Sequence, residues 1–284
     1  MSTSSKSSID VLLSERASEY LSGRVSSGDL AEELRAAGYG LDADLLRLGE
    51  AGPGPYVLSD VRFRGRKVFV SSQPPTRAAI GDVWYDNREL MPALMVPRLK
   101  VLSGCVTRPM PEPGGWISLF PTRYWQLLTF ERLARITWNR PLEGAIRFRH
   151  RRWGPLEDQR FAGGIIHAEA RAYAAWVSKS LQSTWDHNAL YLKLPVDLQH
   201  LVVGRGRAQW EEWARDRFDG GQVGVVGTDS YLGILPFRIV DPGSFGVRRL
   251  ARTFMSAAQV RQVHRRSSGR SRERDFRIRR PLPR

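Results

Sequence analysis

The stretch FAGGIIHAEARAYAAWVSKSLQSTWDHNALYLKLPVDLQHLVVGRGR, residues Phe161 to Arg207, decides how the fold is interpreted. Its apolar positions recur at helical spacing with polar residues between them: Ala168, Ala172, Ala175 and Trp176, alternating with Glu169, Arg171 and Lys179. The segment HAEARAYAAWVSKSL therefore predicts an amphipathic helix. A compact apolar piece, YLKLP, follows after a spacer. Taken alone, this helix and turn indicate only a packed core.

The order of the neighbouring motifs is more informative than any one of them. The helical segment PTRYWQLLTF comes first, then a short turn, the helix above, an LP turn with an acidic residue, the tripeptide GSF, and finally DFRI. These motifs lie at Pro121–Phe130, Asp158–Phe161, His167–Val177, Lys193–Asp197, Gly243–Phe245 and Asp275–Ile278. The order resembles that of the sulfatase-modifying-factor, or formylglycine-generating-enzyme, family, with its two helices, RLPTEAEWE turn, GGSW strand and terminal GFR strand. The resemblance covers roughly the last two thirds of the chain.

The resemblance implies an α+β fold with a C-type-lectin-like domain. We expect this domain to span residues 53–284, with a small helical segment over residues 1–52 before it. The motif AGPGP at residues 51–55 is the clearest linker, because glycine and proline there extend neither a helix nor a sheet. Nine tryptophans suit such a loop-rich fold, since large aromatic side chains can pin irregular segments.

Apolar periodicity predicts three helices in the N-terminal segment, over residues 9–21, 30–37 and 41–48. Ser8 is the expected cap of the first helix, and Asp42 or Asp44 that of the third. Two interpretations of this segment remain open. It is either an arm that packs on the main domain or an adaptor that docks another protein.

The middle of the chain gives further expectations. Residues 56–70 predict a hairpin with a basic turn, and the prolines of residues 71–115 argue for loops with only short strands. The pattern of residues 122–136 predicts a helix that is capped by Thr122 and has its arginines in solvent: Arg123, Arg132 and Arg135. A further helix is predicted over QWEEWARDRF, residues 209–218.

Composition restricts the class of protein. With 42% hydrophobic residues the chain can bury a real core. A single cysteine, Cys105, excludes an intramolecular disulfide, the first residues do not resemble a signal peptide, and no apolar run approaches ~18 residues. We therefore expect a bacterial protein of a reducing cytoplasm with no membrane partner.

The net charge of +15 is concentrated at one end. Thirteen arginines and two acidic residues, a net charge of +11, fall between Val247 and Arg284. The candidate polyanion-binding residues are Arg261, Arg265, Arg266, Arg270, Arg272 and Arg274. Arginines also alternate with aromatic residues over residues 138–160, a pattern that can track a phosphate backbone, although packing onto the domain is the preferred interpretation there.

The residues needed for the family's chemistry are missing. The resemblance implies a copper-binding cysteine pair after the GGSW strand, whereas Gly243–Phe245 is followed by no cysteine and Cys105 lies far upstream. The counterpart of the family's GNVWEW loop, residues 221–232, lacks Trp-Glu-Trp, and Asp229 alone cannot hold a hard cation. The five histidines are scattered, and the turn at residues 204–207 lacks the end of a P-loop. We predict no catalytic, cofactor-binding or metal-binding residue, and Cys105 is expected to be dispensable.

The sequence thus favours a non-catalytic formylglycine-generating-enzyme-like domain that presents a loop-built cleft to a protein or peptide, by analogy within a bacterial defence or signalling system. One alternative is a nucleic-acid-binding protein that uses its arginine-rich end, and another is an enzyme of the same fold with a relocated site. Under the family alignment Trp176 is buried against a terminal strand, DFRIRRPL, and residues 262–274 form a surface loop before that strand.

Overall fold

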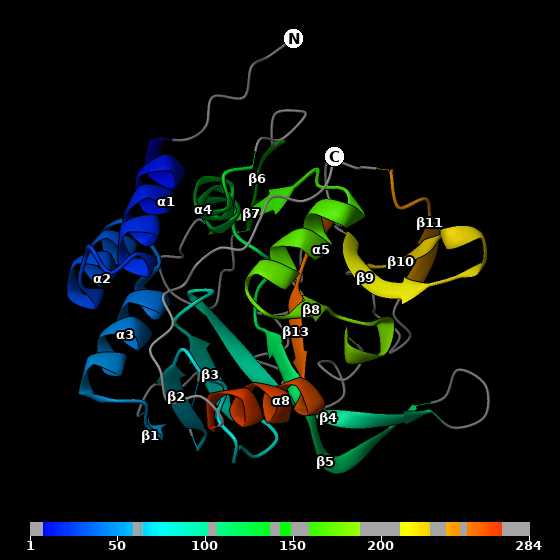
Figure 1. Cartoon of the computed structure of the whole chain (residues 1–284), viewed down its shortest axis with the longest axis horizontal. Coiled ribbons are helices and arrows are strands. Elements are labelled where there is room, and N and C mark those ends of the chain that lie inside the picture. Colours follow the sequence, from blue (N-terminus) through cyan, green and yellow to red (C-terminus); the bar gives the residue numbers. More distant parts are fainter. Residues whose placement is uncertain are drawn as a thin grey trace.

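In the computed structural model, the described residues are 8–58, 63, 65–101, 107–136, 143–148, 159–187, 211–227, 237–244 and 249–268. They form an α+β fold with two mixed sheets and one separate hairpin, as the sequence predicted at this level. Helices α1, α2 and α3 line one side of the molecule, and helix α5 lies in front of the sheets (Figure 1). No helix among these residues is long and apolar enough to cross a membrane.

The N-terminal segment contains the three predicted helices. They are α1 (Ser8–Leu21), α2 (Ser27–Ala36) and α3 (Gly40–Leu48), followed by the short 3-10 helix η1 (Gly49–Ala51). Ser26 caps α2 and forms a reciprocal capping box with Asp29. The cap predicted for α3 is wrong, because no side chain caps this helix and Asp42 points into the core instead.

The N-terminal helices pack on the rest of the chain. Leu13, Leu34 and Leu46 belong to the same apolar cluster as residues of the large sheet. Arg132 and Arg160 bind acidic residues of α1, the exposed Glu15 and the buried Asp10. Of the two interpretations of this segment, these contacts support the packing arm.

The larger sheet has the strand order β1-β2-β3-β4-β5-β13-β8. Its strands are β1 (Tyr56–Val57), β2 (Lys67–Ser71), β3 (Val83–Asp86), β4 (Met91–Val101), β5 (Thr107–Ser118), β8 (Ser180–Leu181) and β13 (Thr253–Ser256). Strands β1 and β2 pair in antiparallel fashion as the hairpin prediction requires, while β2 and β3 run parallel. Both edge strands are only two residues long, which limits pairing with other chains.

Strands β4 and β5 show that the prediction of only short strands in residues 71–115 is wrong, because they span 11 and 12 residues. Their register shifts twice near Pro97, at irregularities of the ladder. A proline removes one donor but is tolerated at such bulges and at positions that need no donor. The prolines therefore distort this hairpin without preventing it.

The smaller sheet has the strand order β11-β10-β9-β12. Its strands are β9 (Glu211–Arg217), β10 (Val223–Gly227), β11 (Phe237–Val240) and β12 (Arg249–Ala251). The short 3-10 helix η3 (Asp219–Gly221) precedes β10. The helix predicted over residues 209–218 is wrong where this segment is described. Pairing with β10 on one side and β12 on the other makes it a strand, so tertiary context overrides local preference. Residues 241–244 form a turn, so Gly243 and Ser244 of the tripeptide GSF do not lie in the strand that the resemblance implies.

Helix α4 (Tyr124–Ala134) confirms the predicted helix but corrects its cap and its polar face. The N-cap position is held by Arg123, whose backbone N–H donates to the side-chain oxygen of Gln126 (2.8 Å). Thr122 is therefore not the cap. Arg132 and Arg135 are exposed as predicted, whereas Arg123 is fully buried.

Helix α5 (His167–Trp176) is the amphipathic helix predicted from the sequence, but the face that it buries differs from the predicted one. It buries Ala170, Tyr173 and Ala174, whereas Ala168 and Ala175 are exposed. Alanine burial contributes little free energy, so the large Tyr173 ring decides which side faces the core. Trp176 is half-buried and packs on the Phe130 ring of α4, with the ring centroids 5.3 Å apart. The terminal strand expected to cover it, residues 275–284, lies outside the described residues.

The chain changes sheets at a single residue near its C-terminal end. Strand β12 belongs to the smaller sheet and β13 to the larger, and Arg252 lies between them. Helix α8 (Ala257–Ser268) follows directly, so the loop predicted from residue 262 is wrong up to residue 268. Strands β6 (Glu143–Phe148) and β7 (Gln159–Gly163) pair with each other and form a separate two-stranded sheet.

Candidate functional site

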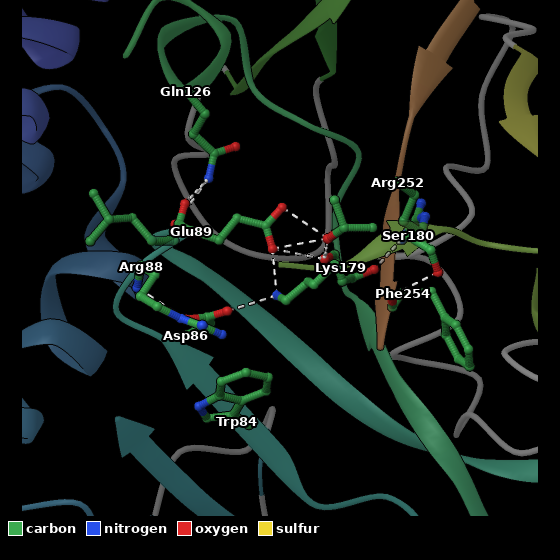
Figure 2. A network of polar contacts seen from close by, with 12 residues as sticks. Trp84, Asp86, Arg88, Glu89, Gln126, Lys179, Ser180, Arg252 and Phe254 are labelled. Atoms are coloured by element: carbon green, nitrogen blue, oxygen red, sulfur yellow. Dashed lines mark hydrogen bonds and ion pairs between the residues drawn. The ribbon is translucent and has the colours of Figure 1, made fainter. Parts of the chain in front are cut away.

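A lysine and two carboxylates lie together in the interior, and we call Asp86, Glu89, Lys179, Ser118 and Thr253 the Lys179 cluster. The Nζ atom of Lys179 lies 2.6 Å from Glu89 Oε2 and 2.9 Å from Asp86 Oδ2. Thr253 donates to Glu89 at 2.9 Å, and Ser118 donates to the same carboxylate at 3.3 Å. Figure 2 shows the lysine reaching between the two acids. All five residues are buried.

Other groups close the cluster from outside. The Trp84 ring lies under the ammonium group, with Nζ 5.0 Å from its centroid. Arg88 donates from its backbone N–H and its side chain to Asp86 Oδ1, at 3.0 and 3.3 Å. Lys179 and Arg88 thus balance the formal charges of the two acids. The site is electrically neutral overall.

Two residues in a left-handed conformation set the geometry. Leu90 (φ 55°) follows Glu89 in the β3–β4 turn, and Ser178 (φ 61°) precedes Lys179 at the end of α5. Such a conformation costs a residue other than glycine roughly 1–2 kcal/mol. Hydrogen bonds support both turns, since Leu90 N–H donates to Asp86 O (2.7 Å) and Lys179 N–H to Ala174 O (2.8 Å). The fold therefore holds Glu89 and Lys179 against each other.

Electrostatics keeps the ion pair charged. Burial alone would raise the pKa of Asp86, but the positive charges of Lys179 and Arg88 outweigh burial and lower it. Burial alone would lower the pKa of Lys179, but Asp86 and Glu89 outweigh burial and raise it. Lys179 is therefore protonated near pH 7 and cannot act as a nucleophile or a base there.

A second buried group, the Arg252 cluster, consists of Arg252, Glu212, Gln182 and His187. Arg252 binds the Glu212 carboxylate through two nitrogens, each at 2.9 Å, and donates to the backbone oxygens of Ser118 (2.8 Å) and Leu119 (2.5 Å). Because Glu212 lies on β9 and Ser118 ends β5, this guanidinium connects the two sheets. Gln182 donates to Glu212 at 2.6 Å.

The histidine of the Arg252 cluster is neutral near pH 7. Burial lowers the pKa of His187 to about 4, although Glu212 partly opposes this shift. Its Nδ1 atom lies 3.1 Å from the side-chain oxygen of Gln182. Burial alone would raise the pKa of Glu212, but the positive charge of Arg252 outweighs burial and lowers this pKa to about 2. The acid and the arginine thus remain ionised while the histidine does not.

A third buried pair ties the N-terminal helices to the domain. Arg123 binds Asp42 of α3 through two nitrogens at 3.0 and 2.7 Å, and both side chains are inaccessible to solvent. The guanidinium lies over the rings of Tyr39 and Phe120, 5.1 and 5.0 Å from their centroids. A paired and stacked arginine of this kind is typical of a structural contact.

These groups resemble an active site in composition but not in access. Acids, a lysine and a histidine meet in the interior, which is the usual reason to suspect catalysis. However, each charge has an opposite charge beside it, and only Arg88 among the clustered side chains exposes a noticeable fraction, 18%. Within the part of the chain that the structure describes, no three His, Cys, Asp or Glu side chains are grouped to hold a metal ion.

The structure describes only some of the residues that the sequence singled out. Arg261, Arg265 and Arg266 lie together on α8 and are exposed. Outside the described residues lie Arg270, Arg272, Arg274, Cys105, Asp229, His150, His200, the LP turn at residues 193–197 and the glycine turn at residues 204–207.

The remaining histidines have structural contacts. His167 Nε2 lies 3.0 Å from Ala214 O, and His264 Nε2 lies 2.6 Å from Pro74 O. Most of the basic and aromatic stretch of residues 138–160 lies outside the described residues, but Arg160 at its end binds the buried Asp10 at 3.0 Å. Each of these side chains therefore joins segments that are distant in sequence.

Sequence reasoning missed all three buried charge groups. The apolar spacing predicts Lys179 and Arg123 on solvent-exposed faces of helices. It gives no prediction for Glu89, Glu212 or Arg252. The only local signal was the combination of charged residues with strongly apolar neighbours, as in LARTF around Arg252. Charged residues are rarely enclosed unless paired, so such a residue within an apolar run indicates a buried partner but does not identify it.

The amino-acid sequence matches no protein-family model and gives no significant match to a curated protein.

Proposed function

We propose that this chain is a non-catalytic formylglycine-generating-enzyme-like protein whose role is to bind a protein partner. The observation that carries the proposal is the enclosure of its charged interior. Lys179, Asp86 and Glu89 have side chains exposed by 1% or less, as do Arg252 and Glu212. No substrate can reach these groups without local unfolding, so they stabilise the fold and the function is assigned to the surface.

The family assignment, with its C-type-lectin-like fold, is part of this proposal. Helices α4 and α5 occur where the resemblance implies helices, at Tyr124–Ala134 and His167–Trp176. The hairpin β6–β7 lies between them in sequence. The GSF motif lends no support because residues 241–244 form a turn. The order of the two helices is thus the main support for the family.

The outer side of α1 is the surface that we assign to the partner. This helix turns polar residues inward: Asp10, Ser14 and Ser18 are buried, and the two serines donate to backbone oxygens one turn earlier, at 2.8 and 2.6 Å. Its apolar residues Ile9 and Leu12 instead expose 37% and 42% of their surface. They lie three residues apart and hence on one face. Apolar side chains presented on a helix suit docking into an apolar groove of another protein.

Charge reversal of the apolar pair tests this assignment. In affinity capture from extracts of the source organism, the full chain is expected to retain one partner reproducibly, and Ile9→Glu/Leu12→Glu to lose it by at least about tenfold. A tenfold loss corresponds to about 1.4 kcal/mol, which is small for placing two carboxylates in an apolar contact. The matched control is Val57→Glu/Ile239→Glu, which alters two other exposed apolar residues.

If Ile9→Glu/Leu12→Glu and Val57→Glu/Ile239→Glu capture the same amount of the partner, a partner site on α1 is contradicted. Folding is checked by thermal unfolding, since all four positions are exposed and the midpoints should agree closely. Stoichiometric binding of Cu(I) by the full chain would contradict the non-catalytic assignment separately, because the proposal leaves the chain without the thiolate pair that holds this ion.

A further inference from the structure

Strands β4 and β5 continue beyond the larger sheet as a two-stranded arm. Up to Pro97 the residues of β4 are buried, whereas Arg98 and Lys100 are exposed, and the register shifts on both sides of Pro97. Register irregularities of this kind bend a ribbon and re-aim its side chains. In Figure 1 the outer ends of the two strands extend away from α8 and from the smaller sheet. We call residues 98–101 and 107–113 the β4–β5 arm.

Two basic residues lie directly opposite each other on this arm. Lys100 of β4 pairs with Arg108 of β5, so both side chains stand on the same face of the ribbon. Directly opposed residues have Cβ atoms about 4.5–5.5 Å apart, and like charges at that separation destabilise a strand pair. Both side chains are exposed, and no carboxylate of the described residues forms an ion pair with either of them. We call Lys100 and Arg108 the arm cation pair.

The third basic residue of the arm is arranged differently. Arg98 lies 3.6 Å from the Glu112 carboxylate, and both side chains are largely exposed. Opposite charges across two strands stabilise the ribbon. Glu112 is the one acidic residue in the sequence from residue 98 to residue 113, which also contains three basic residues, so this stretch has a net charge of +2. The excess positive charge is therefore concentrated at the arm cation pair.

We propose that the arm cation pair binds the phosphate backbone of duplex DNA. Phosphate oxygens placed between the ammonium group of Lys100 and the guanidinium group of Arg108 replace the repulsion by charge-assisted hydrogen bonds. A two-stranded ribbon is narrow enough to enter the major groove, which is about 12 Å wide, and basic side chains on its face can contact the phosphates that border the groove. The net charge of +15 also attracts the chain to polyanions.

The other side chains of the arm favour nucleic acid over a membrane or an added peptide strand. Elements that lie in a membrane interface insert large apolar side chains. In the part of the arm that the structure describes, no such side chain is exposed, since Leu99 packs against the apolar cluster of the larger sheet and Met110 is half-buried. Prolines 109, 111 and 113 have no N–H to donate, so an added strand would find few donors along β5.

Binding of a fluorescein-labelled 20-base-pair duplex by the full chain, followed by anisotropy from about 50 to 200 mM salt, tests the proposal. We expect the wild-type affinity to fall with salt, by about 0.9 in log–log slope for each phosphate neutralised. The variant Lys100→Gln/Arg108→Gln should bind more weakly and lose about one to two units of that slope. The control Arg171→Gln/Arg217→Gln removes the same charge from exposed positions elsewhere and should keep the wild-type slope.

A second variant separates the site from the fold. Lys100→Glu places opposite charges across the two strands, which stabilises a strand pair. Its thermal unfolding midpoint should therefore equal or exceed that of the wild type, while its affinity for the duplex should fall below that of Lys100→Gln. A lower unfolding midpoint would contradict the opposed arrangement of Lys100 and Arg108 from which the proposal starts.

Three further results would overturn the proposal. They are no duplex binding at about 50 mM salt, a slope for Lys100→Gln/Arg108→Gln that equals that of its control, and binding to phosphatidylserine vesicles without binding to the duplex. The proposal is independent of the protein partner assigned to α1, because Ile9→Glu/Leu12→Glu should bind the duplex like the wild type.

Discussion

Lys179→Met is expected to destabilise the protein by about 3–5 kcal/mol, the range for removing one member of a buried ion pair. The substitution leaves Asp86 and Glu89 enclosed without the ammonium group between them. Arg88, the other cation paired with Asp86 among the described residues, contacts Asp86 on its other oxygen. Methionine keeps most of the side-chain volume, so the loss reports the missing charge more than a cavity. Urea unfolding at pH 7 measures it.

Two comparisons isolate the charge of Lys179. The control Lys67→Met removes an exposed lysine and should change stability by less than about 0.5 kcal/mol. The triple variant Lys179→Met/Asp86→Asn/Glu89→Gln removes the lysine and both carboxylates and leaves the partly exposed Arg88 beside them. It should recover much of the loss, because a buried ionic group is costly chiefly when one partner is missing. A single variant as stable as the wild type would contradict the importance of this ion pair.

Arg252→Met is expected to cost a similar amount, about 3–5 kcal/mol, for a different reason. The variant leaves the Glu212 carboxylate buried without its cation and takes the donors away from the backbone oxygens of Ser118 and Leu119. These contacts join the two sheets where β12 passes into β13. Denaturant unfolding should therefore show lower stability and, if the sheets separate, loss of a single cooperative transition.

The pH dependence of the Arg252 variant supplies a second readout. In the wild type, the lowered pKa of Glu212 gives stability that is present above about pH 4.5 and is lost as the pH falls toward 2. Without Arg252, burial raises the pKa of Glu212, so acidification should destabilise the variant less than the wild type over that range. The control Arg215→Met breaks a pair whose arginine is 40% exposed and should cost at most about 1 kcal/mol. Equal losses for Arg252→Met and Arg215→Met would contradict the special role of Arg252.

Local signals predicted the helices α1 to α5 but not α8. The N-terminal helices and α4 follow from apolar spacing and from residues that end a helix, such as Gly23 and Gly38, where a positive φ terminates α1 and α2. The start of α8 was missed although Ser256 and Gln259 form a sequence-visible capping box. The local sequence therefore indicates a helix here, whereas the family alignment predicts a surface loop over residues 262–274.

Pairing between distant segments could not be predicted in the same way. Trp210 and Trp213 have helical spacing in the sequence, yet two neighbouring strands make Glu211–Arg217 the strand β9. Arg123 finds Asp42, which lies 81 residues earlier, and Lys179 finds Glu89, 90 residues earlier. Periodicity identifies the apolar face of an element but carries no information about which charge lies opposite. The buried charge groups therefore became visible only in the folded chain.

The central claim is that the charged interior is a closed scaffold, and the reactivity of Lys179 toward an amine-acylating reagent tests it most directly. The full native chain is labelled at about pH 8, and each lysine is followed by mass spectrometry of its peptide. Lys67 and Lys100 are exposed and serve as internal references. We expect Lys179 to react at least about a hundredfold more slowly than either, because acylation requires an opening that costs most of the stability of the core. Labelling of Lys179 at the rate of the exposed lysines would contradict the account, since it would show that small molecules reach the ion pair.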